Sequence, residues 1–182
     1  MIVWIVGGII FLLGVISIYY INRIIVLSNR IRNARSQIDV QLKRRADLIP
    51  NLIESVKGYK GYEERIIKNV VNARERMVSG KTIDERLRAN EDLTSALKTI
   101  FALAENYPRL RASETFINLQ NQLKETENKI AYSRQFYNDT VLMFNNLIKT
   151  IPGVFFAKLI GKKEENYLKI GEEERRPVRV EF

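Results

Sequence analysis

The 182-residue sequence contains no cysteine and no histidine. These absences exclude disulfides, thiol nucleophiles, the usual Cys/His zinc sites and imidazole acid–base catalysis. The lack of cysteine also suits a reducing compartment. Any chemistry would have to come from carboxylates, lysines, tyrosines and hydroxyl groups. We therefore expect no catalytic residue, no cofactor and no metal site in this protein.

Glycine and proline are also scarce, with 9 and 4 residues. Both residues interrupt helices, so long stretches without either of them favour an all-α fold. The length fits one domain with an appendage.

Charge is absent from the N-terminal segment, in which the first charged side chain is Arg23. The preceding run IVWIVGGIIFLLGVISIYYI forms a helix of about 30 Å, the thickness of the hydrocarbon core of a bilayer. Aromatic residues that favour membrane interfaces lie near its ends, Trp4 at one and Tyr19 and Tyr20 at the other. We predict a transmembrane anchor over residues 1–23, with these three aromatic residues and the arginine at the interfaces.

A cleaved signal peptide is a less suitable interpretation of this run. The sequence has no cationic n-region and no A-x-A cleavage site, and the apolar run is longer than a typical h-region. A buried core helix rarely extends this far without a polar residue. Gly7, Gly14 and Ser17 form a small-residue face that could pair helices in a homo-oligomer, although no strict G-x-x-x-G is present.

Positive charge directly follows the predicted anchor. Arg23, Arg30, Arg32 and Arg35 precede the first acidic residue, Asp39. The positive-inside tendency places this side of the anchor in the cytoplasm. We predict a single-pass protein of the cell membrane with a short external N-terminus and a cytoplasmic C-terminal region.

Helical periodicity continues after the anchor. Apolar or small residues recur every three or four positions, at Ile24, Leu27, Ile31, Ala34, Ile38, Leu42, Ile49, Leu52 and Val56. Pro50 donates no N–H and its ring collides with the carbonyl of Ala46. We expect a kink or break near Asp47–Pro50, with Asp47 capping the next segment, and an end of the helix at Gly58 and Gly61.

Three further helices are expected from periodicity and helix-terminal signals. The first covers residues 63–78. The second begins at Thr82, which forms a capping box with Glu85, and is broken at Pro108. The third covers residues 113–151. Its apolar residues have heptad-like spacing, at Phe116, Leu119, Leu123, Ile130, Tyr137, Val141, Phe144, Ile148 and Ile151.

These helices, joined by short loops, predict an antiparallel up-and-down four-helix bundle over residues 24–151. Asn138 and Asn145 place polar groups on the inner face of the last helix, where they either fix helix register or line a groove for a ligand. Residues 152–182 are predicted to form a short apolar and basic segment followed by a charged tail. The apolar part either closes the end of the bundle or dips into the membrane interface.

Three stretches resemble the LemA family: NARSQIDVQLKRRADLIPNLIESVKGY from Asn33, AENYPRLRASETFINLQNQLKETENKIAYSRQFYND from Ala104, and the closing RRPVRVEF. The resemblance implies a bacterial or archaeal membrane protein with one N-terminal span and a cytoplasmic helical bundle. It supplies no reaction and no catalytic residues. The family often has His-Glu after VKGY, whereas here Tyr62 precedes Glu63, so no role of that histidine applies.

Lys43, Arg44 and Arg45 are our candidate partner-binding residues. On a helix perpendicular to the membrane, Arg44 would lie about 33 Å beyond the bilayer, several Debye lengths of about 8 Å each. Direct attraction to lipid is then screened. The three cations should therefore either pair with carboxylates of neighbouring helices or form a patch for a protein partner, whereas a helix lying flat would restore lipid contact.

Nucleic acid is another partner class that a net charge of +9 admits. Residues 23–45 hold seven cations and one acid, a net charge of +6, and the chain beyond them is nearly balanced. Charge concentrated beside a span serves anchoring at the cytoplasmic face, so we do not expect nucleic-acid binding.

An enzyme of this composition would depend on neighbouring carboxylates. These are the pairs Glu63 and Glu64, and Glu125 and Glu127, and the run from Glu172 to Glu174. None has the E-x-x-H companion of a di-iron bundle, and acidic pairs on long helices usually form solvated faces.

We interpret the chain as a non-catalytic scaffold or interaction protein at the cytoplasmic face of the membrane. Its expected partners are the lipid bilayer and a membrane or cytoplasmic protein. The alternative is an accessory or ligand-sensing protein of a membrane transport or signalling system, with a polar bundle core.

Overall fold

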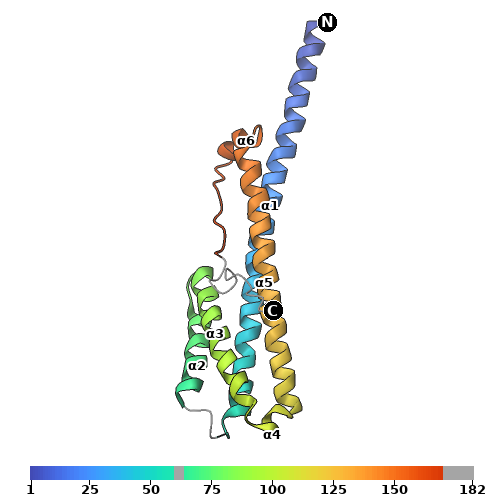
Figure 1. Ribbon diagram of the computed structural model, residues 1–182. Coiled ribbons are helices and arrows are strands. Elements are labelled where there is room, and N and C mark those ends of the chain that lie inside the picture. The colour runs from blue at the N-terminus through green and yellow to red at the C-terminus, as the bar shows by residue number, and fades with distance from the viewer. Residues whose placement is uncertain (60–63, 170–182) are drawn as a thin grey trace, which may run out of the picture. The chain divides into compact units, whose positions relative to one another are not determined.

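The computed structural model describes residues 1–59 and 64–169, and these residues contain helices and no strand, which confirms the all-α prediction. The helices are α1 (Ile2–Val56), α2 (Glu64–Ser79), α3 (Ile83–Ala104), α4 (Pro108–Arg111), α5 (Glu114–Lys149) and α6 (Gly153–Leu159) (Figure 1).

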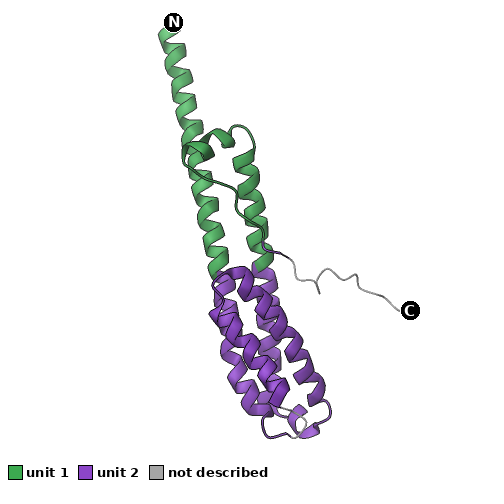
Figure 2. Cartoon of the chain, turned by 90° about the vertical axis from the view of Figure 1, so that its left-hand side faces the viewer, with its two compact units in different colours: residues 1–36, 134–167 green, residues 37–133, 168–182 purple. Residues whose placement is uncertain are grey.

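The chain divides into two compact units, coloured separately in Figure 2. Of the described residues, unit 1 contains 1–36 and 134–167, and unit 2 contains 37–59, 64–133 and 168–169. The long helices α1 and α5 therefore contribute to both units. Helices α2, α3 and α4 belong to unit 2, and α6 belongs to unit 1.

The first part of α1 is apolar and uncovered. Every residue from 1 to 15 is exposed, and the first buried side chain is that of Ile24. By length and composition α1 can cross a membrane, and none of its most apolar stretch is buried. From Ile24 onward, all nine positions predicted to face inward are buried, which confirms the predicted stripe.

A kink or break was predicted near Asp47–Pro50. Helix α1 continues through Pro50, so the predicted break is wrong. Asp47 caps no new segment. Its carboxylate instead lies 3.1 Å from Nζ of Lys43, one turn earlier in the same helix. The helix ends at Val56, just before Gly58 as predicted, whereas Gly61 lies outside the described residues.

A contact from another helix explains why the chain stays helical at Pro50. The proline cannot donate a hydrogen bond to the carbonyl of Ala46. Nε of Arg74 on α2 donates one to that oxygen instead, at 2.9 Å. A tertiary donor thus satisfies the carbonyl that the proline leaves open.

Helices α2 and α3 form a hairpin in unit 2. Helix α2 ends at Ser79, one residue beyond the predicted end at 78, and α3 begins with the predicted capping box. The amide of Glu85 donates to Oγ1 of Thr82 at 3.2 Å, and a carboxylate oxygen of Glu85 accepts from the Thr82 amide at 3.4 Å. Helix α3 ends at Ala104, and Pro108 starts the short α4.

Helix α5 buries the predicted apolar positions, with one exception. Ile151 is 80% exposed, because α5 ends at Lys149 and the chain turns there. In unit 2, α5 packs on α3, and the rings of Phe101 and Phe116 meet edge to face at 5.9 Å.

In unit 1 the chain after α6 runs back along α5 without helix (Figures 1 and 2). The side-chain amide of Asn145 holds it through two hydrogen bonds with the backbone of Glu165, at 2.9 and 3.0 Å. The hydroxyl of Tyr137 donates to the carbonyl of Asn166 at 3.1 Å. Asn145 therefore serves to fix this segment. The charged tail from residue 170 lies outside the described residues.

Candidate functional site

Arg45 lies in the interior of unit 2 and is 3% exposed. Its guanidinium forms an ion pair with Glu127 on α5 and donates to Oδ1 of Asn90 on α3 at 2.7 Å. Burial lowers the pKa of Arg45 to about 10, so the side chain is still charged at neutral pH. Because an unpaired buried charge is costly, the ion pair ties α1 to α5.

Lys43 and Arg44, by contrast, lie at the surface. Lys43 pairs with Asp47 within α1, whereas Nη1 of Arg44 lies 3.9 Å from Oε1 of Glu125 on α5. A hydrogen bond from Lys129, and then the charges of Lys129 and Arg44, lower the pKa of the Glu125 carboxyl. All three cations of the candidate patch thus lie near carboxylates. Their role in binding a partner stays a prediction.

A cavity of about 220 Å³ adjoins Arg45. Its walls include apolar side chains from α3 and α5, among them Leu97, Phe101 and Leu123. Nε of Arg45 is buried and has no hydrogen-bond partner among the described residues. Because this nitrogen is itself buried, a small ligand in the cavity would contact mainly the apolar walls.

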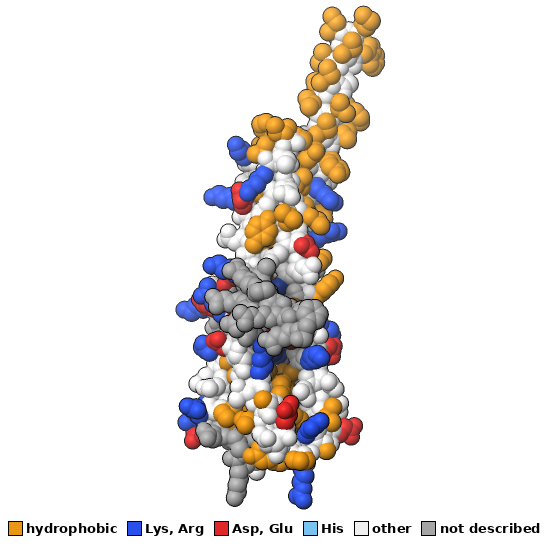
Figure 3. All heavy atoms as spheres, in the orientation of Figure 1, with side chains coloured by type: hydrophobic (Ala, Val, Ile, Leu, Met, Phe, Trp, Pro, Cys, Tyr) orange, Lys and Arg blue, Asp and Glu red, His pale blue; other side chains and the backbone are white. Residues whose placement is uncertain are grey.

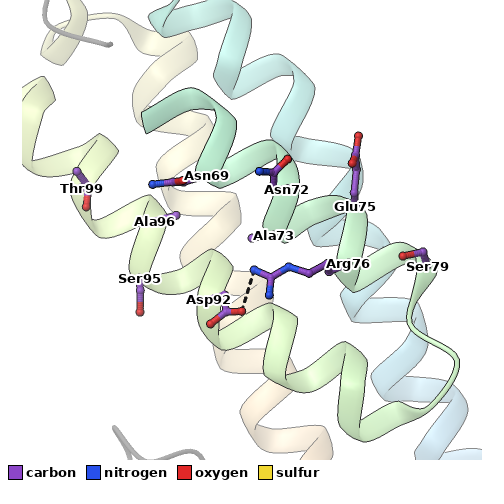
Figure 4. A pocket seen from close by; sticks show the side chains of 10 residues that line it. All are labelled: Asn69, Asn72, Ala73, Glu75, Arg76, Ser79, Asp92, Ser95, Ala96 and Thr99. Carbon is purple, nitrogen blue, oxygen red and sulfur yellow. Dashed lines mark ion pairs between the residues drawn. The ribbon is translucent and has the colours of Figure 1, made fainter. Parts of the chain in front are cut away.

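The hairpin of α2 and α3 carries a larger groove of about 760 Å³ on its solvent-facing side (Figure 4). Ala73, which is buried, and Ala96, which is half-buried, leave its floor free of bulky side chains. Uncharged polar side chains from both helices surround this floor, at Asn69, Asn72, Ser79, Ser95 and Thr99. The groove therefore offers hydrogen-bonding groups around a small-residue floor.

One ion pair bridges the groove. Nη2 of Arg76 on α2 lies 2.9 Å from Oδ2 of Asp92 on α3, as Figure 4 shows. A second hollow of about 530 Å³ shares both residues and extends toward the loop between the helices. At this end Gly80 is closely packed, since a Cβ there would lie 2.7 Å from Cγ of Arg86.

The groove suits binding better than chemistry. The side chains of Arg76 and Asp92 neutralise each other, and no group of three or more metal-ligating side chains occurs in the described parts of the chain. Our sequence reasoning missed this groove. The signal was available in the outward positions of α2 and α3, where Asn69, Asn72 and Ser95 stand in place of long side chains.

The four residues predicted at the membrane interfaces all lie on α1, in the apolar run or just after it. Trp4 is 85% exposed and Tyr19 is 62% exposed, and Arg23 is also exposed. Tyr20 is half-buried because its ring stacks on Phe156 of α6, with centroids 5.7 Å apart. Their interfacial role stays a prediction.

The LemA family model matches residues 34–182. The chain belongs to the LemA family. This confirms the resemblance found in the sequence, and the match includes α2 to α6 together with residues 34–56 of α1.

Curated proteins extend the comparison. The chain is 27% identical to the protein LemA of Metamycoplasma hominis over 169 residues, which cover 87% of this chain and 74% of that protein. It is 21% identical to the magnetosome protein MamQ of Magnetospirillum gryphiswaldense, over 80% of this chain. The chain spans 63% of the length of MamQ. With its uncovered apolar helix, this LemA-family chain is a membrane-associated protein.

Proposed function

We propose that this LemA-family protein is a non-catalytic interaction protein, held at the cytoplasmic face of the cell membrane by α1, and that the groove between α2 and α3 receives a segment of a protein partner. The observation that carries the proposal is the groove itself. It is open to solvent, its floor is made of Ala73 and Ala96, and its rim presents amides and hydroxyls. Such a surface allows close approach of a helix or an extended segment.

The membrane tether is supported by the continuity of α1. One helix joins the exposed apolar residues before Ile16 to the buried stripe that ends at Val56. Arg23, Arg30 and Arg35 are exposed just after the apolar run. Arginines on this side of a span favour its cytoplasmic location.

We further propose that unit 2 is an antiparallel four-helix bundle, built from residues 37–56 of α1, from α2 and α3, and from residues 114–133 of α5. Contacts between the helices support this arrangement. Arg74 joins α2 to α1, Arg45 joins α1 to α3 and α5, and the Phe101–Phe116 ring pair joins α3 to α5. A bundle fixed in this way would hold the groove open before a partner binds.

The chemistry of the groove indicates the kind of segment it binds. Its ion pair is internally neutral, and most other lining groups are uncharged. A partner segment with small and uncharged polar side chains is therefore favoured over a strongly charged one.

Site-specific photo-crosslinking in cells tests this proposal. A photoreactive amino acid replaces Asn72 or Ser95 in the groove of the full chain, and Tyr132, which is 71% exposed on α5, serves as the matched control. We expect discrete crosslinked products from the groove positions and none of these products from the control. The substitution Ser95→Arg should remove the products formed from Asn72. Identical products from all three positions would contradict the proposal.

A second function is favoured by a different observation, the 220 Å³ cavity with mainly apolar walls beside the buried Arg45. A ligand-sensing protein would hold a small, mainly apolar molecule there. The substitution Leu97→Phe should then abolish the cellular activity of the protein. The crosslinked products formed from position 95 should be unchanged. Loss of function with Ser95→Arg alone would favour the groove.

A further inference from the structure

We propose that α6 is a second membrane-contacting element, which lies in the headgroup region of the bilayer beside α1. The proposal rests on the membrane tether proposed above and adds a new contact to it. From the sequence, this apolar segment could either close the end of the bundle or dip into the membrane interface. We assign it to the membrane interface.

An exposed apolar face in and just before α6 is the first observation. Ile151, Phe155 and Leu159 are 80%, 63% and 76% exposed. Phe155 and Leu159 are four residues apart, so they share one side of α6, and Ile151 is exposed in the turn just before the helix. Gly153 and Ala157 on the other side are buried in unit 1. The helix is therefore packed on one side and has an uncovered apolar surface on the other.

The position of α6 on α1 is the second observation. Phe156 stacks on Tyr20 at 5.7 Å with an angle of 19° between the rings. Just after α6, Nζ of Lys162 donates to Oγ of Ser28 at 2.9 Å. Both contacts lie within unit 1, and they fix α6 at the end of the apolar run.

The length of the apolar run then determines the depth of α6. From Ile2 to Tyr20 the helix rises about 27 Å, close to the thickness of about 30 Å of a hydrocarbon core. The fully uncovered residues end at Val15, after only about 20 Å from the same start. A span that fills the bilayer must therefore bring the level of Tyr20, and with it α6, to the membrane boundary.

Orientation and charge agree with this depth. Helix α6 is bent by 94° from α5, which runs beside α1 in unit 1 (Figures 1 and 2). It therefore lies across α1, as a helix in the plane of the membrane would. Lys158 and Lys163 are exposed, and lysine side chains can extend their charge to anionic headgroups while their stems contact apolar material.

Continuity of the surface favours lipid over a protein as the occupant. In Figure 3 the hydrophobic side chains at α6 adjoin those of the uncovered part of α1, and blue cationic side chains begin just below them. The arrangement of an apolar face bordered by lysines is typical of interfacial helices. One lipid surface covers both apolar regions at the same time.

The absence of native cysteine allows a direct test with single labelled thiols. The full chain is reconstituted into vesicles of phosphatidylcholine and phosphatidylglycerol, with an environment-sensitive fluorophore on Phe155→Cys or Leu159→Cys. Phe136→Cys, at a 44% exposed aromatic residue of α5 in unit 1, is the matched control. Phe11→Cys, at a 74% exposed residue of the apolar run, reports the span.

We expect blue-shifted emission at positions 155, 159 and 11, and quenching by nitroxide-labelled lipids that is several-fold greater than at position 136. If positions 155 and 159 match position 136 while position 11 is quenched, the tether stands and the inference about α6 is wrong. If position 11 is not quenched, the tether and the inference both fail. Because all four residues are exposed, their replacement should leave the fold intact.

Discussion

Nε of Arg74 on α2 donates a hydrogen bond of 2.9 Å to the carbonyl of Ala46 on α1, the carbonyl that Pro50 leaves without its helical donor. This contact joins two helices of unit 2 at the point where α1 has lost a hydrogen bond of its own. It accounts for a proline within a 55-residue helix.

The pairing predicts an energetic coupling between Arg74 and Pro50. Arg74→Met should lower the free energy of unfolding by about 1–3 kcal/mol, because the buried carbonyl of Ala46 loses its donor. In a Pro50→Ala background the helix supplies its own donor, so the same substitution should cost clearly less. Chemical denaturation of the full chain in detergent measures both effects.

Arg65→Met, at an exposed position of the same helix, is the control for loss of a surface arginine. If Arg74→Met lowers the free energy of unfolding equally in the wild type and in the Pro50→Ala background, the Arg74 hydrogen bond does not compensate for the N–H that Pro50 lacks.

The buried ion pair of Arg45 and Glu127 gives a second prediction. Glu127→Gln should destabilise unit 2 by about 3 kcal/mol, because Arg45 stays charged and loses its counter-ion. We place the cost at the lower end of the usual range since the Glu127 side chain is 37% exposed. The double variant Arg45→Met, Glu127→Leu should recover most of the loss, because it removes both charges.

The surface pair of Lys43 and Asp47 is the matched control. Asp47→Asn should cost less than about 1 kcal/mol, as is usual for exposed pairs. If Glu127→Gln costs no more than Asp47→Asn, the account is wrong and water compensates the charge of Arg45.

Glu125 provides a prediction about pH. The hydrogen bond from Lys129 and the charge of Arg44 lower its pKa, so the folded state favours its ionised form. The resulting stabilisation is complete above the ordinary value of 4.5 and is lost as the pH falls through the lower folded value. The wild type should therefore be more stable than Glu125→Gln at pH 7, and this difference should vanish in strong acid.

Denaturation midpoints of both proteins across this pH range measure the difference. A constant difference, or one that grows as the pH falls, would contradict the assignment.

Gly80 at the end of the groove predicts a packing effect. A Cβ at this position would overlap Cγ of Arg86, whose guanidinium binds Asp39 at 2.6 Å and the Met77 carbonyl at 3.2 Å. Gly80→Ala should therefore lower the free energy of unfolding by about 1–3 kcal/mol. Gly58→Ala meets no atom within 4 Å and should be close to neutral in the same thermal melt. Equal melting temperatures of the two variants would refute this account of Arg86.

The sequence was sufficient for features that depend on neighbours along the chain. The buried stripe from Ile24 to Val56 follows from helical periodicity, and the Thr82–Glu85 capping box follows from a four-residue motif. The family resemblance was also visible in short stretches. These signals are local, so they need no knowledge of which helices meet.

Features that depend on contacts between helices could not be predicted. Pro50 indicated a break, because the donor that replaces its missing N–H comes from Arg74, 24 residues later. The three cations from Lys43 to Arg45 form one patch in the sequence, yet helical geometry places Arg45 in the interior and the other two outside. Predicting the groove required knowing that α2 pairs with α3, and periodicity along the chain does not show which helices pair.

Labelling of Ser95→Cys with a membrane-impermeant maleimide tests the central claim most directly, because this residue lies in the groove and the chain has no other thiol. The full-length protein is labelled in intact cells and in inverted membrane vesicles. We predict labelling in the inverted vesicles and none in intact cells. Labelling in intact cells, or recovery of the uncleaved protein in the soluble fraction, would contradict a groove held at the cytoplasmic face by α1.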